Sequence, residues 1–364
     1  MDEACHLYRA AEPSAASHLA LRLKGWTRYT VPLDGRAQKA CWKLFHPGRI
    51  ELPLRAMAQL PGLFGAVRSQ ENEKMALLRA ALGGETGVSC CKAGVPGPWS
   101  KETVLFLDQA AEPKLVVKAG VGESVDGLLR NEAQWLRALR DQPMLADNVA
   151  DLVAHQSGKD FCFVAQSVLP GNPEFQFGEL HFSFLKEFHA FSRRRLRYEE
   201  SGLFHNMQAR MKELDGLLTE DWSRRIEKAM RRVEEAISGE PILMTAAHND
   251  FAPWNIRVEG QVARVFDWEY AEQEQLPLFD PLHFALMPMA LKRKSSAKMM
   301  RRMRQTLESC TTGLGQEECH AAETQALAYL TNLCTLYLCF MRGRSYTHAV
   351  LNSYAPIIDC LCRL

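Results

Sequence analysis

Two short runs rich in β-branched and apolar residues, Thr103 to Leu107 and Lys114 to Gly120, flank a polar turn. Such runs around a turn predict an antiparallel β-hairpin. The segment that follows, Val125 to Asp141, repeats apolar residues at the spacing of an amphipathic helix, and Ser124 is the candidate N-cap. The first constraint on the fold is therefore a strand pair followed by a helix with one apolar stripe.

A lysine and a glutamate interrupt the apolar faces of these elements. Glu132 lies on the stripe of the predicted helix, midway between Leu128 and Leu136, and Lys118 closes the apolar part of the second strand. A charge on a buried face is costly unless it is paired. We therefore predict an ion pair between Lys118 and Glu132, the alternative being that both side chains extend to water.

The rest of the chain divides into a β-rich part and an α-rich part. Residues 1 to 88 contain short strand-like pieces broken by proline and glycine, and "ALGGETG" at 81–87 reads as a linker. Phe161 to Gly171 reads as a strand that ends in a Pro-Gly stop, and the pattern after it is mostly helical. This order predicts an α+β fold, with a small β-rich part followed by a larger α-rich part.

Charge, apolar runs and cysteine spacing give no sign of a nucleic-acid-binding, membrane-spanning or secreted protein. The 364 residues carry a net charge of +1, which gives no argument for a nucleic acid or an anionic membrane as partner. The longest apolar run, Ala326 to Met341, is shorter than a membrane span, so we expect a buried helix. The first residues, "MDEACHLYRA", lack a basic stretch followed by an apolar one, so we expect no secretory signal. The eleven cysteines include no C-x-x-C pair, so we expect reduced thiols in a cytoplasmic protein.

The stretch "HNDFAPWN", His248 to Asn255, precedes a second predicted hairpin. Its strands, "IRV" and "VARVF", meet at "EGQ", and a turn about Gly260 and Gln261 pairs residues whose numbers sum to about 521 or 522. Asn255 and Asp267 would then face each other and offer an amide oxygen and a carboxylate to a hard cation such as Mg²⁺. The alternative is a polar cross-strand pair without a metal.

Five polar residues follow the order expected of a kinase. Kinases combine a strand lysine and a helix glutamate with a catalytic aspartate, an asparagine five residues later, and a second, metal-binding aspartate. The chain supplies these in order as Lys118, Glu132, Asp250, Asn255 and Asp267. Agreement at five positions, each on the expected kind of element, is much rarer by chance than any single match.

On these residues the chain resembles the aminoglycoside phosphotransferase and choline kinase family. "HNDFAPWN" is similar to the family's catalytic loop H-G-D-x-x-x-x-N, "FDWEYA" (Phe266 to Ala271) to its metal motif, and "FDPLHFA" (Phe279 to Ala285) to the helix start that follows. "FVAQSVLPG" resembles the strand and hinge that bind adenine. The chain departs from the family at Asn249, which replaces a glycine, and in a phosphate loop that offers only Gly94 and Gly97. Asparagine tolerates unusual backbone angles better than most residues.

The resemblance implies a protein-kinase-like bilobal fold. Residues 89–170 would form a small β-rich N-lobe that binds ATP, and residues 171–364 a larger α-helical C-lobe with the catalytic loop, the metal site and the acceptor site. Residues 1–88 would be an extra N-terminal segment of unassigned role.

The resemblance also implies a role for each candidate site residue. Asp250 would orient the acceptor hydroxyl, Asn255 and Asp267 would hold Mg²⁺, and His248 would brace the loop. Apart from the resemblance, Trp254 is expected to pack in the core, the alternative being a platform for the substrate. The residues implied at the nucleotide are Lys118, Glu132, Ser167, Leu169 and Gly97.

The implied function is transfer of the γ-phosphate of ATP to a hydroxyl of a small molecule, such as a sugar, an amino alcohol, an aminoglycoside-like compound or a nucleoside. Two alternatives stay open because a fold does not fix a function. One is a pseudokinase, a nucleotide-binding scaffold whose residues 1–88 bind a protein partner. The other is a metal-dependent hydrolase with His248, Asp250 and Asp267 as ligands.

Overall fold

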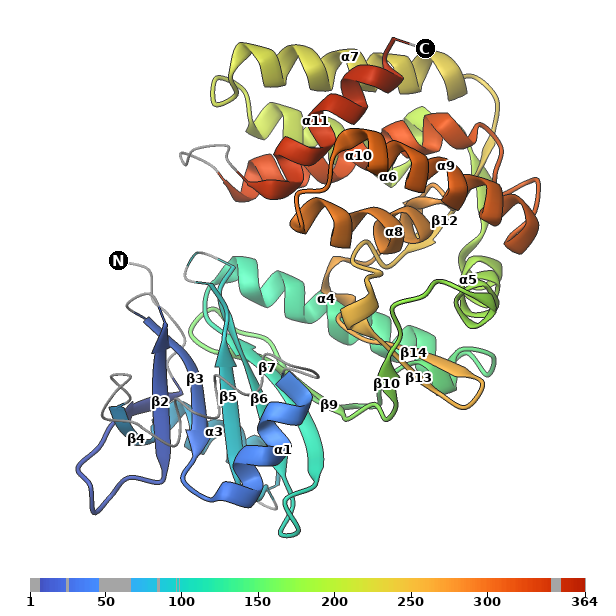
Figure 1. The fold of residues 1–364 in the computed structure, drawn as a ribbon. Coiled ribbons are helices and arrows are strands. Elements are labelled where there is room, and N and C mark those ends of the chain that lie inside the picture. Colours follow the sequence, from blue (N-terminus) through green and yellow to red (C-terminus); the bar gives the residue numbers. More distant parts are fainter. Residues whose placement is uncertain are drawn as a thin grey trace. The chain divides into compact units, whose positions relative to one another are not determined.

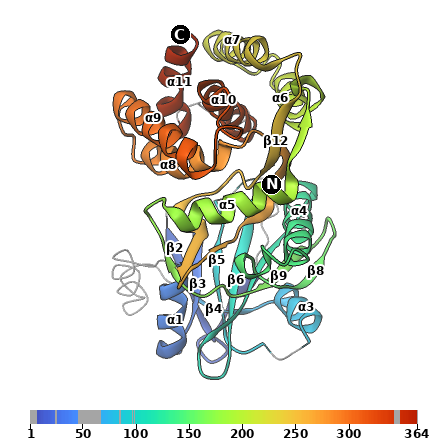
Figure 2. The same ribbon diagram turned by 90° about the vertical axis from the view of Figure 1, so that its right-hand side faces the viewer.

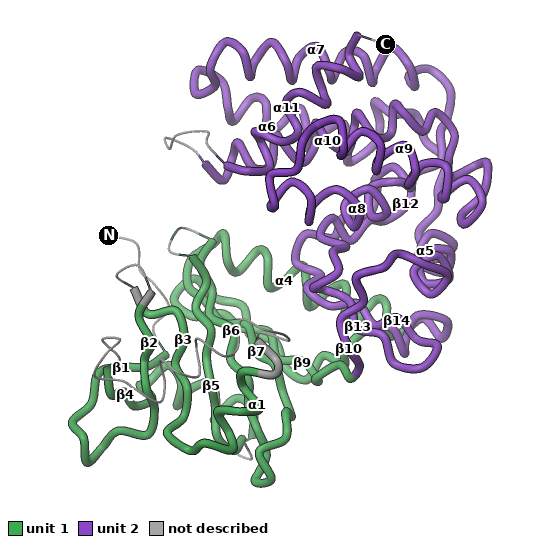
Figure 3. The backbone as a smooth tube through the Cα atoms, in the orientation of Figure 1, with its two compact units in different colours: residues 1–141, 149–170 green, residues 142–148, 171–364 purple. Residues whose placement is uncertain are grey.

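The chain folds into two compact units (Figure 3). Unit 1 comprises residues 1–141 and 149–170, and unit 2 comprises residues 142–148 and 171–364. The structure is a computed structural model, and the residues it describes are 7–23, 26–45, 67–83, 86–95, 97, 99–341 and 348–363. Most described strands lie in unit 1 and most described helices in unit 2, which confirms the expected α+β class.

The described strands of unit 1 form one antiparallel sheet (Figure 1). The predicted hairpin is confirmed as β6 and β7, which pair from Lys101 with Gly120 to Leu107 with Pro113. Four strands from the first 88 residues extend the same sheet. The order across the sheet is β1 (Tyr8–Ala10), β4 (Val67–Glu71), β2 (His18–Leu23), β3 (Trp26–Pro32), β5 (Ser89–Ala93), β6 (Lys101–Leu107), β7 (Pro113–Gly120), β9 (Cys162–Ser167) and β8 (Leu152–Gln156).

Helices cover both faces of this sheet, because successive side chains along a strand point to opposite faces. On one face, Phe106 of β6 shares an apolar cluster with Met75 of α3 (Glu73–Ala81). On the other face, the neighbouring Leu105 packs in a cluster with Cys41 of α1 (Gly35–Phe45). Each face of the sheet therefore has its own apolar core.

The helix α4 (Glu123–Arg140) packs on β9 through an apolar cluster that includes Leu129 and Val164. The expectation that Ser124 caps this helix is wrong. The helix begins at Glu123, its N-cap is Gly122, and no side chain caps it. Gly122 has φ of 90°, a conformation that glycine adopts without strain, and it lets the chain turn from β7 into the helix within three residues.

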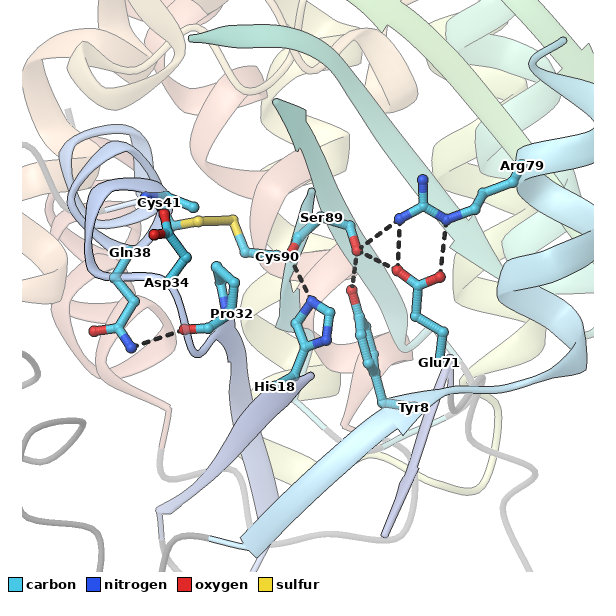
Figure 4. The surroundings of a disulfide bond; sticks show 11 residues. Tyr8, His18, Pro32, Asp34, Gln38, Cys41, Glu71, Arg79, Ser89 and Cys90 are labelled. Atoms are coloured by element: carbon cyan, nitrogen blue, oxygen red, sulfur yellow. Dashed lines mark hydrogen bonds and ion pairs between the residues drawn. A yellow bond between two sulfur atoms is a disulfide. The ribbon is translucent and has the colours of Figure 1, made fainter. Parts of the chain in front are cut away.

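A disulfide between Cys41 of α1 and Cys90 of β5 joins the N-terminal segment to the strand that follows it (Figure 4). Both cysteines are fully buried. The expectation of reduced thiols is therefore wrong for this pair, whereas the other cysteines in the described part of the chain form no disulfide. The two residues are 49 positions apart, and they meet because β3, which leads into α1, is the neighbour of β5 in the sheet.

A polar network ties the first strands to β5 beside this disulfide (Figure 4). Arg79 donates to both carboxylate oxygens of Glu71, with Nε 2.8 Å and Nη2 2.6 Å away. Ser89 Oγ donates to Glu71 at 2.6 Å and lies 2.8 Å from the hydroxyl of Tyr8. His18 Nε2 lies 2.9 Å from the carbonyl oxygen of Ser89. The described part of the N-terminal segment is thus fixed to the sheet by strands, a disulfide and charged hydrogen bonds.

Unit 2 is built mainly from helices (Figure 2). It also contains two small antiparallel sheets. One sheet has the order β10 (Asn172–Pro173), β13 (Ile256–Glu259), β14 (Val262–Val265), and the other β11 (Arg194–Leu196), β12 (Ile242–Ala247), β15 (Glu272–Gln275). The helices are α5 (Glu179–Ser192), α6 (Gly202–Glu213), α7 (Glu220–Ile237), α8 (Phe279–Leu291), α9 (Ser296–Gly313), α10 (Ala322–Phe340) and α11 (Ala349–Leu361). The single-turn helices are η1 (Ala146–Asn148), η2 (Tyr198–Glu200), η3 (Pro253–Asn255) and η4 (Trp268–Tyr270).

The apolar run near the C-terminus forms α10, as predicted, and most of its residues are buried. Among the described residues, no helix combines the length and apolar character needed to cross a membrane.

Candidate active site

In unit 1, Lys118 and Glu132 form the predicted ion pair. Lys118 Nζ lies 2.7 Å from each carboxylate oxygen of Glu132. The lysine is 6% exposed and the glutamate is fully buried, so the alternative in which both extend to water is excluded. Gln166 Nε2 lies 3.4 Å from Glu132 Oε1 and adds a further donor. Lys118 pairs with Val164 across the β7–β9 ladder, so its side chain projects to the face that α4 covers.

The candidate purine contacts lie at the end of β9. The N–H of Ser167 donates to the carbonyl of Asp151 at 3.0 Å, and its Oγ accepts from the N–H of Asp151 at 2.9 Å. The backbone N–H of Ser167 is therefore already used, so of its backbone groups the carbonyl is the one that could contact a ligand. Leu169 is partly buried two residues further on, still in unit 1.

The loop between β5 and β6 contains the two candidate phosphate-loop glycines. A Cβ atom on Gly94 would lie 2.8 Å from the carbonyl oxygen of Lys101, so this position requires glycine. A Cβ atom on Gly97 would meet nothing within 4 Å. The carbonyl of Gly97 accepts a hydrogen bond of 2.9 Å from the N–H of Ser100, which closes a turn. Gly97 therefore has room for a side chain, whereas at Gly94 the backbone of Lys101 comes too close for one.

In unit 2, His248 braces the loop that follows β12. It is fully buried, its Nδ1 accepts from the N–H of Asp250 at 3.2 Å, and its Nε2 lies 3.1 Å from the carbonyl oxygen of Phe266. Burial lowers the pKa of His248 to about 4, although the carboxylates of Asp250 and Asp267 act in the opposite direction. The imidazole is thus neutral at neutral pH, with its proton on Nε2 and both nitrogens hydrogen-bonded.

Asp280, in the first turn of α8, holds the backbone of the same loop. Its carboxylate accepts from the N–H of His248 at 2.8 Å and from the N–H of Asn249 at 3.0 Å. Burial raises the pKa of Asp280 to about 6 in spite of these bonds. Asn249 has φ of 62°, and its Nδ2 donates to the carbonyl of Tyr270 at 3.0 Å. Asn249 thus adopts the left-handed conformation that we expected of an asparagine in place of the family's glycine.

The carboxylate of Asp250 is held by two side chains. Asn255 Nδ2 lies 2.7 Å from Oδ2, and His283 Nε2 lies 3.0 Å from Oδ1. The side chain of Asp250 is 26% exposed, whereas that of His283 is 2% exposed. The carboxylate is therefore partly open to solvent while its supports are buried. Because Nδ2 of Asn255 is bound to Asp250, its amide oxygen is the atom that could serve a cation.

Asp267 does not face Asn255, so the predicted cross-strand pair is wrong by one residue. Ile256 pairs with Val265, and the N–H of Phe266 donates to the carbonyl of Asn255 at 3.1 Å. Asp267 follows the ladder at φ of 74°, in the left-handed region. In this conformation the side chain of Asp267 no longer follows the pattern of a strand, in which successive side chains point to opposite faces. Asn255 and Asp267 nevertheless lie at the same end of the hairpin.

Glu269 brings a further carboxylate to Asp267. The two side chains have carboxylate oxygens within 4.8 Å of each other, and Glu269 is 5% exposed. Asn255 lies at the same end of the hairpin, and its amide oxygen would join these carboxylates as hard oxygen donors of the kind that Mg²⁺ prefers.

Three residues to which the sequence assigned no role therefore contact or adjoin the candidate site residues: Glu269, Asp280 and His283. All three lie in the motifs "FDWEYA" and "FDPLHFA", which carried the family resemblance. The expectation for Trp254 is wrong, since 38% of this residue is exposed.

Solved structures with a similar fold include enzymes of two kinds. A thermostable mutant of aminoglycoside phosphotransferase APH(4)-Ia in complex with ADP and hygromycin B matches with a TM-score of 0.51 and 10% identity, over 79% of this chain and 97% of that chain. Choline kinase LicA from Streptococcus pneumoniae matches with a TM-score of 0.51 and 11% identity, over 80% of this chain and all of that chain. At these identities the likeness shows the fold alone, and it confirms the protein-kinase-like fold. No curated protein sequence matches this chain.

The model of a family described as the phosphotransferase enzyme family matches residues 93–280. This range is more than half of the chain. It contains Lys118, Glu132, Asp250, Asn255 and Asp267. The chain therefore belongs to the phosphotransferase enzyme family.

Proposed function

We propose that this protein transfers the γ-phosphate of ATP to a hydroxyl group of a small molecule. The observation that carries the proposal is the carboxylate of Asp250, which is partly exposed while Asn255 and His283 hold it from the buried side. A carboxylate fixed in this way is suited to orient a hydroxyl nucleophile. Family membership supports phosphotransferase chemistry. The ADP in the APH(4)-Ia complex supports ATP as the phosphate donor.

In the proposed reaction, Asp250 orients the acceptor hydroxyl and receives its proton. The acceptor oxygen forms a bond to the γ-phosphorus while the bond from that phosphorus to the β–γ bridging oxygen breaks, and ADP leaves. Phosphoryl transfer of this kind requires mainly positioning and charge neutralisation from the protein. His248 and Asp280 serve it indirectly, because they fix the loop that carries Asp250.

The nucleotide would be held mainly by residues of unit 1. Lys118, kept in place by Glu132, would contact the α- and β-phosphates. Ser167, through its carbonyl, and Leu169, through its N–H, would contact the purine, and Gly97 would lie in the loop at the phosphates. We propose on this basis that residues 89–170 are the nucleotide-binding part of the chain. The described strands β1 to β4 extend its sheet.

Asn255 and Asp267 of unit 2, with Glu269, would hold Mg²⁺ through oxygen atoms. Bound magnesium would neutralise the charge on the phosphates. The remaining part of the site would bind the acceptor, which we place among sugars, amino alcohols, aminoglycoside-like compounds and nucleosides. The relatives named above include a hygromycin B complex and a choline kinase, and they support a small polar acceptor.

A phosphate-transfer screen tests the proposal. The protein is incubated with magnesium and ATP radiolabelled in the γ-phosphate, against separate pools of sugars, amino alcohols, aminoglycosides and nucleosides. We expect a labelled product from one pool with the natural chain and none with Asp250→Asn. No labelled product, with a melting temperature still raised by magnesium and ATP, would favour the pseudokinase. Release of labelled phosphate that survives Lys118→Ala would favour the hydrolase, which has no use for that lysine.

A further inference from the structure

We infer that His283 is a positioning residue for Asp250, which it holds through a hydrogen bond from Nε2 to Oδ1. The inference rests on the proposed function, in which Asp250 orients the acceptor hydroxyl. His283 itself is 2% exposed and lies behind the carboxylate, 3.0 Å from it. It therefore acts through Asp250.

His283 and Asp280 hold the same loop from the same helix. They are three residues apart in α8, so their side chains project from one face of it. Asp280 accepts hydrogen bonds from the backbone of His248 and Asn249, while His283 contacts the side chain of Asp250. One helix face thus sets both the path of the loop and the orientation of its carboxylate.

The partners of His283 define its tautomer. A carboxylate accepts hydrogen bonds, so Nε2 carries the proton that faces Asp250, and Nδ1 of a neutral imidazole is an acceptor. The hydroxyl of Tyr329 lies 3.4 Å from Nδ1, and the hydroxyl of Tyr354 lies 3.3 Å from that of Tyr329. Burial raises the pKa of both phenols well above the usual value, so both keep their protons. The hydrogen bonds run in one direction, from Tyr354 through Tyr329 and His283 to Asp250.

Two donors on opposite oxygens fix the plane of the Asp250 carboxylate. A carboxylate has about four lone-pair positions, and Asn255 and His283 each occupy one on a different oxygen. The remaining lone pairs are then held in fixed directions on the exposed side. Without His283, Asn255 is the one side-chain donor left among these contacts, and the carboxylate can rotate about its Cβ–Cγ bond.

A matched pair of variants separates the contact with Asp250 from the packing of the helix. The amide nitrogen of glutamine reaches about as far as Nε2 of histidine, whereas that of asparagine reaches only to the position of Nδ1. His283→Gln can therefore still donate to Asp250, and His283→Asn cannot. We expect His283→Asn to lower kcat about 10- to 100-fold, because small misplacement of a reacting group costs about that much. The KM for ATP should stay within about twofold, and His283→Gln should keep kcat within about threefold.

Nitrogen-15 NMR of the imidazole provides a readout independent of activity. The natural protein should show His283 protonated at Nε2, the nitrogen that faces Asp250, and a proton at Nδ1 instead would overturn the inference. Tyr329→Phe, which removes the donor to Nδ1, should lower kcat by several-fold with the KM for ATP unchanged. Circular dichroism and unfolding curves confirm that each variant is folded before its kinetics are compared.

The kinetic outcomes distinguish this inference from the proposed function. An active natural protein whose folded His283→Gln and His283→Asn variants lose kcat equally overturns the inference alone. A natural protein that transfers no phosphate to any pool overturns the proposed function, and the positioning role with it.

Discussion

The side-chain amide of Asn255 donates to the carboxylate of Asp250, with Nδ2 2.7 Å from Oδ2. One amide thus joins the residue proposed to orient the acceptor to the residue proposed to hold the metal. Since its nitrogen is bound to Asp250, its oxygen is left for a cation. In Asp250→Ala the amide nitrogen keeps its second hydrogen bond, to the backbone carbonyl of residue 250 at 3.0 Å, so the amide oxygen should stay in place. Loss of Asp267, in contrast, removes a proposed ligand outright.

Lys118 and Glu132 should behave as one unit. Removal of one partner of a buried ion pair leaves an unpaired charge and typically costs about 3–5 kcal/mol. We expect Lys118→Met and Glu132→Gln each to reduce turnover severely and to lower the free energy of unfolding. The double variant should be little worse than either, because coupled groups are not additive. Kinetics and urea denaturation of the four proteins measure this, and fully additive losses would show that the pair is not coupled.

Asn249 should be replaceable by glycine more easily than by alanine. Both variants lose the hydrogen bond to Tyr270, which is worth about 0.5–1.5 kcal/mol. At φ of 62°, alanine adds about 1–2 kcal/mol of strain that glycine avoids. Urea denaturation gives the two free energies of unfolding, and an alanine variant as stable as the glycine variant would contradict the assigned backbone conformation.

The Lys118–Glu132 pair was predictable because each residue breaks the apolar pattern of its own element. The register of β13 and β14 could be predicted only to within one residue, because the turn sequence allows two ways of pairing the strands. The left-handed backbone of Asp267, which decides where its side chain goes, depends on packing around the loop. The sequence therefore predicts which residues meet at this end of the hairpin, but not how they face.

Other parts of the site and fold depend on contacts that sequence spacing does not encode. Cys41 meets Cys90 because β3 lies beside β5, an order that a single sequence does not reveal. His283 lies in the first half of α8, where nearly every residue is buried, so no amphipathic stripe marks its direction. A histidine in so apolar a helix is itself a signal, because a buried polar group needs a partner. This signal indicates that His283 has a hydrogen-bond partner, but it does not identify that partner as Asp250.

The disulfide should contribute measurably to the stability of unit 1. A cross-link between residues 49 positions apart typically stabilises a protein by about 2–4 kcal/mol. We expect Cys41→Ser, Cys90→Ser and the double variant to lose similar amounts of stability, and the exposed Cys360→Ser to lose little. Thiol titration of the unfolded, unreduced natural protein should find two thiols fewer than its eleven cysteines. A count of eleven would contradict the disulfide.

Buried neutral histidines should make unit 2 unstable in acid. Burial lowers the pKa of His181 and His248 to about 4, and burial with the nearby Arg193 lowers that of His189 to about 3. The unfolded chain therefore binds more protons than the folded chain as the pH falls below about 6.5, and stability drops between about pH 6.5 and 4. Asp280, with its pKa raised to about 6, has the opposite effect in part of this window, but three histidines outweigh it.

Replacement of one such histidine tests this pH dependence. His189→Leu should flatten the dependence of the unfolding free energy on pH by up to about 1.4 kcal/mol per pH unit, the contribution of one proton. Substitution of His205, which is exposed, is the control and should leave the slope unchanged. Urea denaturation from pH 4.5 to 7.5 measures the slopes, and parallel curves for the natural chain and His189→Leu would contradict a neutral buried imidazole.

Calorimetric titration of Asp250→Ala and Asp267→Ala with ATP, with and without magnesium, tests the central claim most directly. Asp250→Ala should bind magnesium and ATP nearly as the natural protein does while losing phosphate transfer, because it removes the group that orients the acceptor. Asp267→Ala should bind the nucleotide more weakly and recover in part with added magnesium, because it removes a cation ligand. Loss of ATP binding in Asp250→Ala with retention in Asp267→Ala would contradict the roles assigned to both residues.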